Sequence, residues 1–319
     1  MKKSIVISLI VAGVLVLVGA GLFAGAMSAA EWDFSVLNTY EVVNNTYDVH
    51  DPFNSIAIES DTADLCFVKS NDGKCRVETV DNSNHVYNVA VTDGTLQIGM
   101  DSKGKIAFGI GVYRSSVTVY LPEDVYGTLT VRQDTGDIEI PENFSFESID
   151  MELGTGDVVS SADTAGTCRI TTDTGDVKVQ GVSVGALELR TTTGRITASD
   201  VACAGNVSIN VSTGKIYLTD LTCRDLMSTG SSGDVTLKHV IASGGFFITR
   251  DSGDVALDGC DAAAIEIKTD TGDVEGTFLT PKIIYAQSNT GRIEVPRSTT
   301  GVICEITTDT GDIKILFKS

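Results

Sequence analysis

A four-residue signature recurs ten times in this chain of 319 residues. Each copy reads Ser or Thr, then Gly, then Asp, Lys or Arg, then Val or Ile. Successive glycines are 19 or 20 residues apart. Such a regular period is typical of repeat proteins, in which each unit packs against its neighbours. The ten glycines, called corner glycines below, are Gly136, Gly156, Gly175, Gly194, Gly214, Gly233, Gly253, Gly272, Gly291 and Gly311.

Aligning the copies on their corner glycines produces columns of apolar residues. The residue two positions after the glycine is always Val or Ile, and the residue seven positions before it is always apolar. Five positions before the glycine, nine of ten copies are apolar and Ser228 is the exception. This alternation predicts strands with one buried face. Because the apolar positions change parity at the glycine, we expect a corner there, where glycine accepts a positive φ.

We therefore predict an all-β chain whose repeats form a β-solenoid of about 19–20-residue coils. Each coil consists of a strand, a corner, a second strand and a return loop, and we expect the coil to be right-handed, as parallel crossovers are. A sandwich of antiparallel hairpins is the competing fold, but a sandwich does not require ten equal repeats. Degenerate copies at 62–65 and 93–96 place the start of the repeat domain near residue 51, so that it covers 51–319.

One segment interrupts the period, and another ends it. Residues 101–113 contain three glycines and are predicted to form an extended hairpin or loop. Residues 313–318 are expected to form the last strand of the stack, with lysines that blunt its exposed edge.

The first fifty residues form a separate part of the chain. An uncharged apolar run over 5–27 follows Lys2 and Lys3, and about 20 residues suffice to cross a bilayer. We predict a single transmembrane anchor over 5–27, with 1–4 in the cytoplasm and the solenoid outside the cell membrane. Residues 28–50 are assigned to a linker and N-terminal cap. A cleaved signal peptide is the alternative, because small residues suited to cleavage lie at 24–26 and 28–30.

Charge and motif content argue against several functions. The chain has 43 acidic and 23 basic residues, and a net charge of −20 disfavours nucleic acids and anionic lipid surfaces as partners. The three histidines have no metal-ligand spacing. Asp-Thr-Gly, the signature of aspartic proteases, occurs four times, but within the repeat we interpret its Asp as a corner cap. The aspartates of the four Asp-Thr-Gly motifs are Asp134, Asp173, Asp270 and Asp309.

We predict no catalytic residues, no enzymatic activity and no required cofactor.

Seven cysteines are an odd number, so at least one thiol is expected to be free or paired between chains. Cys168 and Cys304 fall in the apolar column and are predicted to lie in the core. Cys203 and Cys223 each lie nine residues after a corner glycine, so stacking on consecutive coils would allow a disulfide. A second disulfide is proposed between Cys66 and Cys75, across a hairpin around the Asn-Asp-Gly turn.

Acidic residues concentrate at the corners. Asp251, Asp254, Asp270 and Asp273 are expected to bring four carboxylates to one edge of the solenoid. Calcium accepts oxygen ligands in irregular geometry, so these four residues are a candidate calcium site. The preferred interpretation is that the aspartates cap turns and bond to nearby backbone amides.

One segment and the repeats together suggest a family. The run Val117-Thr118-Val119-Tyr120-Leu121-Pro122, followed by repeated Thr-Gly-Asp-Val and Thr-Gly-Asp-Ile units, resembles the bacterial putative-adhesin family over about residues 50–319. That family is a domain of unknown function built from β-strand repeats, and the resemblance implies a solenoid outside a bacterial membrane.

Three functions are compatible with these features. We expect a membrane-anchored, extracellular, non-enzymatic scaffold or adhesin that binds a cell-surface protein or polysaccharide. The alternatives are an envelope sensor that acts with a membrane protein and, less favoured, a polysaccharide-active β-helix enzyme.

Overall fold

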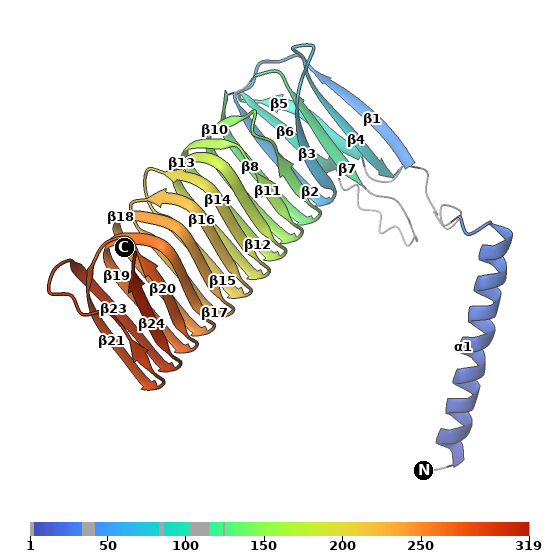
Figure 1. The fold of residues 1–319 in the computed structure, drawn as a ribbon. Coiled ribbons are helices and arrows are strands. Elements are labelled where there is room, and N and C mark those ends of the chain that lie inside the picture. Colours follow the sequence, from blue (N-terminus) through green and yellow to red (C-terminus); the bar gives the residue numbers. More distant parts are fainter. Residues whose placement is uncertain (1–2, 34–41, 83–85, 102–114, 124, 319) are drawn as a thin grey trace.

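The computed structural model describes residues 3–33, 42–82, 86–101, 115–123 and 125–318. In these residues one helix, α1 (Lys3–Ala29), precedes twenty-four strands that belong to one continuous sheet folded into stacked coils (Figure 1). The predicted β-solenoid with one N-terminal apolar helix is therefore confirmed. Most of the loop predicted at 101–113 lies outside the described residues.

Helix α1 is apolar along most of its length. Its segment Ile10–Ala29 has a mean hydropathy of 2.4 and is long enough to cross a membrane. The helix ends where the backbone N–H of Trp32 donates to the carbonyl of Met27 at 2.8 Å. By length and composition alone, a retained anchor and a signal sequence both fit this helix.

Each coil contributes one strand before its corner glycine and one after it. The strands before the glycines are β2 (Ser55–Thr62), β8 (Val125–Thr135), β10 (Ser145–Thr155), β12 (Asp163–Thr174), β15 (Val207–Thr213), β17 (Leu226–Ser232), β21 (Lys282–Thr290) and β23 (Val302–Thr310). The strands after the glycines are β3 (Asp64–Lys69), β9 (Ile138–Ile140), β11 (Val158–Ser160), β14 (Ile196–Cys203), β16 (Ile216–Cys223), β20 (Val274–Phe278), β22 (Ile293–Glu294) and β24 (Ile313–Phe317). Three long strands serve one coil with their first half and the next coil with their second half: β13 (Val177–Thr193), β18 (Val235–Ser252) and β19 (Val255–Thr271).

Neighbouring coils pair in parallel and in register, so each predicted column is a real stack of side chains. Ile149 pairs with Leu129 on one side and with Cys168 on the other. All three side chains are buried, as are the Val and Ile residues two positions after the glycine in every coil except the one containing Ile293. The core is thus a set of apolar ladders that run along the solenoid.

The corner glycines are positions of close backbone contact between coils. Their φ angles lie between +123° and +159°, a conformation that residues with a side chain rarely adopt. A Cβ atom on Gly214 would lie 1.8 Å from the carbonyl oxygen of Gly194 in the preceding coil. The same contact occurs at every corner glycine, so a side chain at any of these ten positions would overlap the backbone of the neighbouring coil.

Buried hydroxyl groups reinforce the corners. Three residues before the glycine, the Thr191 hydroxyl donates to the Gly175 carbonyl at 3.1 Å, and the Thr308 hydroxyl donates to the Gly272 carbonyl at 3.0 Å. Each bond joins one coil to the preceding coil in space. These hydroxyl groups satisfy glycine carbonyls that would otherwise be buried beside the core.

A second corner, which the sequence analysis missed, lies six residues after several corner glycines. The residues there have φ angles between 51° and 65°, and the inward-facing positions change parity again: in β14, Ile196 and Ala198 face inward before the corner and Val201 and Cys203 after it. Gly and Asp tolerate this left-handed conformation better than most residues. The second-corner residues are Gly181, Asp200, Asp220, His239 and Gly259.

The N-terminal end starts with one complete coil. Ala63 takes the first corner, because a Cβ on Gly136 would lie 2.1 Å from its carbonyl oxygen. The second degenerate copy is not a corner: Asp93 and Gly94, with φ of 51° and 74°, form the tight turn of an antiparallel hairpin. The hairpin and three further strands complete this end: β5 (Val86–Thr92), β6 (Thr95–Asp101), β1 (Val42–Val49), β4 (Cys75–Asn82) and β7 (Ser116–Leu121).

At the C-terminal end the coils do not stack in chain order. Strand β23 lies between β19 and β21, and β24 lies between β20 and β22. The prediction that 313–318 forms the last strand is therefore wrong, and Ile313 and Ile315 are fully buried. The outermost unit is the coil of β21 and β22, called the terminal coil below. This order buries Ile306 and Ile315 and leaves the smaller Ala286 and Val295 at the end.

The corner contact predicts different outcomes for two glycines. Gly214→Ala should prevent stable folding, because the new methyl group overlaps a backbone oxygen that cannot move without separating two coils. Gly181→Asp should cost only about 1 kcal/mol or less, because Asp occupies the same second-corner position in two other coils and the space around Gly181 is open. Thermal melting of both variants checks this, and similar melting temperatures would contradict the account.

Candidate functional surface

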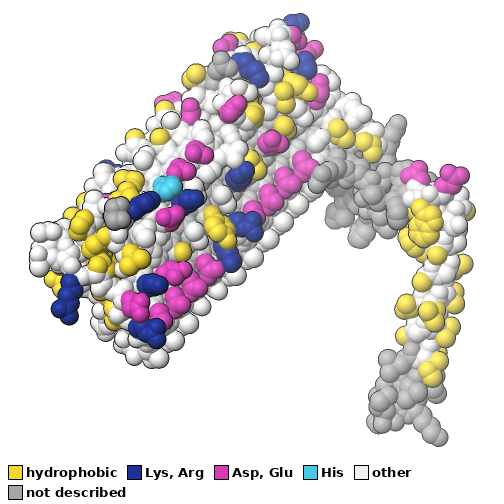
Figure 2. Space-filling model, viewed as in Figure 1, with side chains coloured by type: hydrophobic (Ala, Val, Ile, Leu, Met, Phe, Trp, Pro, Cys, Tyr) yellow, Lys and Arg dark blue, Asp and Glu magenta, His cyan; other side chains and the backbone are white. Residues whose placement is uncertain are grey.

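Aspartates that follow the corner glycines form a hydrogen-bonded ladder along one edge. Each carboxylate accepts a hydrogen bond from the backbone N–H of the equivalent residue in the next coil. In the first run the Asp157 amide donates to Asp137 at 2.9 Å, the Asp176 amide to Asp157 at 2.7 Å, and the Arg195 amide to Asp176 at 2.7 Å. We call this arrangement the aspartate ladder; it appears as rows of acidic side chains in Figure 2.

A second run of the ladder follows the spatial order of the coils. The Asp273 amide donates to Asp254 at 2.9 Å, the Asp312 amide to Asp273 at 2.7 Å, and the Arg292 amide to Asp312 at 2.7 Å. Both runs end at an arginine, whose guanidinium has no oxygen to accept the next amide. The second run begins at Asp234, whose carboxylate accepts the Asp254 amide at 3.2 Å.

The basic residues between the two runs also act electrostatically. The Lys215 ammonium lies 2.9 Å from a carboxylate oxygen of Asp234. The hydrogen bond from Lys215, followed by that from the Asp254 amide, lowers the pKa of the Asp234 carboxyl. The two basic residues between the runs therefore relieve part of the repulsion that a continuous acidic row would create.

Two of the four aspartates of the candidate calcium site belong to the aspartate ladder. Asp254 and Asp273 each use one carboxylate oxygen to bond the next coil, while Asp251 and Asp270 are exposed two positions before their glycines. Among the described residues, no three His, Cys, Asp or Glu side chains are grouped so that they could hold a metal ion. Calcium binding at these four aspartates stays a prediction without geometric support, whereas the expected bonds to backbone amides are present.

The cysteines are free thiols. Cys168 and Cys304 lie in the core as predicted, and burial raises the pKa of each thiol to about 12. Cys203 and Cys223 lie on consecutive coils, as the pairing of Ala202 with Thr222 shows, but they form no disulfide here. The predicted disulfide between Cys66 and Cys75 is wrong. Strand β7 lies between β3, which carries Cys66, and β4, which carries Cys75.

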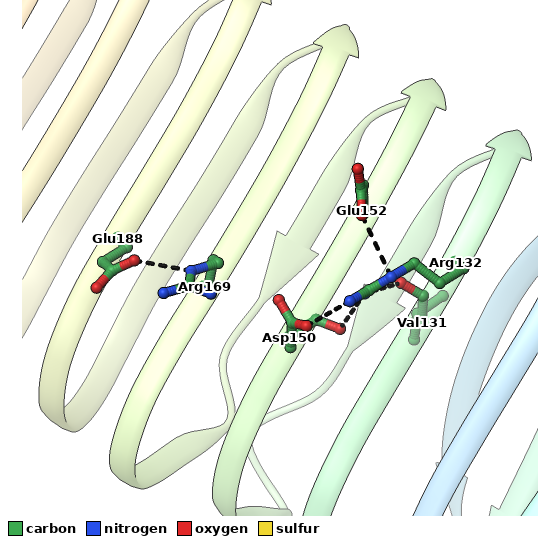
Figure 3. A network of polar contacts seen from close by, with 6 residues as sticks. All are labelled: Val131, Arg132, Asp150, Glu152, Arg169 and Glu188. Carbon is green, nitrogen blue, oxygen red and sulfur yellow. Dashed lines mark hydrogen bonds and ion pairs between the residues drawn. The ribbon is translucent and has the colours of Figure 1, made fainter.

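The outer face of the early coils carries ion pairs between neighbouring strands. Arg132 lies 2.5 Å from the Asp150 carboxylate and 3.2 Å from that of Glu152, and Arg169 lies 2.7 Å from that of Glu188 (Figure 3). All five side chains are substantially exposed to solvent. Exposed pairs typically contribute less than about 1 kcal/mol each, so we interpret this face as a solvated surface.

A groove of about 510 Å³ lies on the middle coils, where β13, β15, β17 and β18 meet the solvent. The side chains of Met227 and Phe247 are 51% and 39% exposed, although they stand in an outward column that holds Ser208 and Glu188 in the preceding coils. Apolar side chains in a polar column are unusual on the surface of a solenoid. We call this feature the central groove; its lining consists of Ala186, Glu188, Gly205, Asn206, Val207, Ser208, Arg224, Asp225, Met227 and Phe247.

A polar network fixes the rim of the central groove. The Arg224 Nε donates to Asn206 Oδ1 at 3.0 Å and to Asp225 Oδ2 at 3.3 Å. Asp225 Oδ1 accepts the Gly245 amide at 2.9 Å. A Cβ on Gly245 would lie 2.6 Å from the Phe247 ring, so the missing side chain makes room for the ring. The groove therefore combines two apolar side chains with donors and acceptors held in place, a composition suited to ligand binding.

A buried arginine lies beneath the strands that carry Met227 and Phe247. Arg250 is 1% exposed; its Nη1 donates to the Val211 carbonyl at 3.1 Å and its Nη2 to the Ser228 hydroxyl at 3.4 Å. Its Nε has no partner, and no ion pair of Arg250 occurs in the described part of the chain. Burial lowers its pKa to about 10, so the guanidinium remains charged at neutral pH. Gly230 leaves space for Nη1, which would lie 1.9 Å from a Cβ there.

Sequence reasoning overlooked the central groove, although it identified Ser228 as an exception. Three residues depart from the residue types of their columns: Ser228, Gly230 and Arg250. They do so because Arg250 bonds to Ser228 and fits beside Gly230. The available signal was that these exceptions and the two exposed apolar residues occur in the same two coils. Deviations from a repeat pattern tend to mark strained or functional places.

Comparison with known proteins identifies a family match. Toastrack DUF4097 matches residues 53–210 and 202–319. No protein with a curated description matches the chain.

Solved structures resemble parts of the fold at low identity. A putative adhesin from Bacteroides fragilis is 17% identical, with 86% of this chain and 97% of that chain covered and a TM-score of 0.36. A putative adhesin from Parabacteroides distasonis is 13% identical, with 87% and 98% covered and a TM-score of 0.42. A protein from the same organism described as a putative lipid binding protein is 13% identical, with 86% and 96% covered and a TM-score of 0.32.

The aspartate ladder predicts a difference between two substitutions at one position. Asp254→Ala removes the acceptor of the Asp273 amide and should destabilise the fold by about 1 kcal/mol. Asp254→Asn keeps an acceptor oxygen and removes a like charge, so it should cost less. Equilibrium unfolding of both variants, with exposed Glu266→Ala as the control, checks the order. Equal losses for Ala and Asn would show that charge, and not the amide bond, is what matters.

The buried arginine predicts an unusual stabilising substitution. Arg250→Met removes an unpaired buried charge while keeping a side chain of similar length, and should raise stability by about 1 kcal/mol or more. The matched change Arg169→Met, at an exposed arginine, should have little effect. A loss of stability in Arg250→Met would mean that the two hydrogen bonds of the guanidinium outweigh its desolvation.

Proposed function

The chain belongs to the Toastrack DUF4097 family, and we propose that it is a non-enzymatic binding scaffold held by α1 at the outer face of the cell membrane. The observation that carries this proposal is the central groove, where exposed Met227 and Phe247 lie beside a fixed polar rim. The partner is a cell-surface protein or polysaccharide, as expected of an adhesin or an envelope scaffold.

The use of the repeated polar residues supports a non-enzymatic role. The corner aspartates bond to backbone amides of the next coil, and the buried threonines bond to glycine carbonyls. Residues engaged in this way serve the stacking of the coils.

The features of the N-terminal segment support membrane attachment with the solenoid outside. The span Ile10–Ala29 is long and apolar enough to cross a bilayer. Lys2 and Lys3 precede it, and positively charged flanks favour the cytoplasmic side. The repeat domain would then be exported.

The role of the groove is tested by removing its two apolar side chains. Met227→Ser with Phe247→Ser should abolish partner capture when cells that display the full chain are treated with a membrane-impermeant cross-linker. Serine is the natural residue in the same column at Ser208. Val125→Ser, which removes an exposed apolar side chain elsewhere, is the control and should leave capture unchanged. If both variants capture the same partners as the unaltered chain, the groove is not the binding site.

Topology is tested independently with a reporter fused after Ser319. We expect the reporter to be accessible from outside the cell and to remain in the membrane fraction. A reporter protected inside the cell would refute the orientation. Release of the whole protein into the medium would instead favour a cleaved signal peptide.

A further inference from the structure

Exposed large apolar side chains concentrate at the C-terminal end of the solenoid. The coils between Gly136 and Gly253 expose only Met227 and Phe247 in this way, both at the central groove. The last two coils and the bend after β20 expose five, each at 41–61% of its surface: Leu279, Tyr285, Ile293, Ile303 and Leu316. Such a concentration at one end of a chain with a net charge of −20 indicates that this end takes part in an interaction.

The terminal coil leaves a strand edge open. Within the described residues, β21 pairs only with β23, so the backbone N–H and C=O groups of its other edge have no strand partner. Ile284 and Ala286 stand in the two apolar columns before the glycine, which are at most 3% exposed in every interior coil from Gly136 onward. Here both residues are only partly buried, because no other coil in the described part of the chain covers them.

The edge lacks the features that usually prevent strand pairing. Exposed edges are normally protected by charged residues, proline or bulges. From Ile283 to Thr290, β21 contains no charged residue and no proline. The one charge at its start, Lys282, is buried and bonded to the Asp261 carboxylate.

We propose that a second copy of this chain occupies the open edge, with β21 of the two copies paired antiparallel across a two-fold axis. Such an axis places identical residues close together, so charges on the strand would repel, and an uncharged strand avoids this. To cover Ile284 and Ala286, the partner must present a surface with the same shape and size as the terminal coil. The terminal coil of a second copy is such a surface. The N-terminal end does not, because it finishes in the antiparallel strands β1 and β5.

The isologous arrangement closes as a dimer and does not extend into a fibre, because each copy has one such end. The two solenoids meet tail to tail. Since α1 precedes the opposite end of the solenoid in each copy, the two membrane segments enter the dimer from its two outer ends (Figure 1). This interface is separate from the central groove and does not depend on what the groove binds.

Sedimentation velocity of the full chain in detergent micelles tests the proposal. We expect a dimer at micromolar concentration. Tyr285→Lys with Gln287→Lys places four positive charges across the two-fold axis and should convert the dimer to a monomer. Thr249→Lys is the matched control, since it occupies the same column as Gln287 on the interior strand β18 and should leave the dimer intact.

Thermal melting of the variants separates loss of pairing from loss of folding. The double variant should retain the cooperative transition of the control. A monomeric unaltered chain would overturn the proposal. So would a double variant that still dimerises, because association would then run through another surface, such as α1.

Discussion

Close contact between glycine backbones is the constraint on which the rest of the structure depends. At each corner a glycine lies against the carbonyl of the equivalent residue in the neighbouring coil, at a distance that excludes a Cβ. This contact fixes the register of the coils, and the register in turn stacks the apolar columns. It also brings each corner aspartate within reach of the next amide and each buried threonine within reach of a glycine carbonyl. One small residue per coil therefore makes three further sets of interactions possible.

The reversed order of the last two coils follows from the same ladders. If the coils stacked in chain order, Arg292 would lie between Asp273 and Asp312 and could not accept the next amide. In the observed order the Asp312 amide bonds Asp273 and the Arg292 amide bonds Asp312, so the arginine stands at the end. The order also encloses Ile306 and Ile315. Both hydrogen bonding and apolar burial favour the arrangement.

The sequence predicts the repeated features well and the exceptions poorly. Period, inward columns and corners could be predicted because each is a local pattern that occurs ten times. The second corner could have been found from the column that contains Gly181 and Asp200. It was overlooked because this column holds different residue types, including His239. The order of the last coils and the hydrogen bonds of the buried Arg250 could not be predicted, because they depend on contacts between coils and a column alignment treats each coil separately. The central groove left a signal in the columns, because Ser228, Met227 and Phe247 depart from the pattern in two consecutive coils, but each exception was considered separately.

Disulfide trapping at the aspartate ladder tests the stacking order most directly. Equivalent residues on adjacent coils are about 4.8 Å apart, within reach of a disulfide, whereas those two coils apart are about 10 Å apart and beyond it. Asp273→Cys with Asp312→Cys should therefore cross-link on mild oxidation, and Asp273→Cys with Arg292→Cys should not, as mapped by mass spectrometry. Cross-linking of the second pair but not the first would contradict the account and restore chain order.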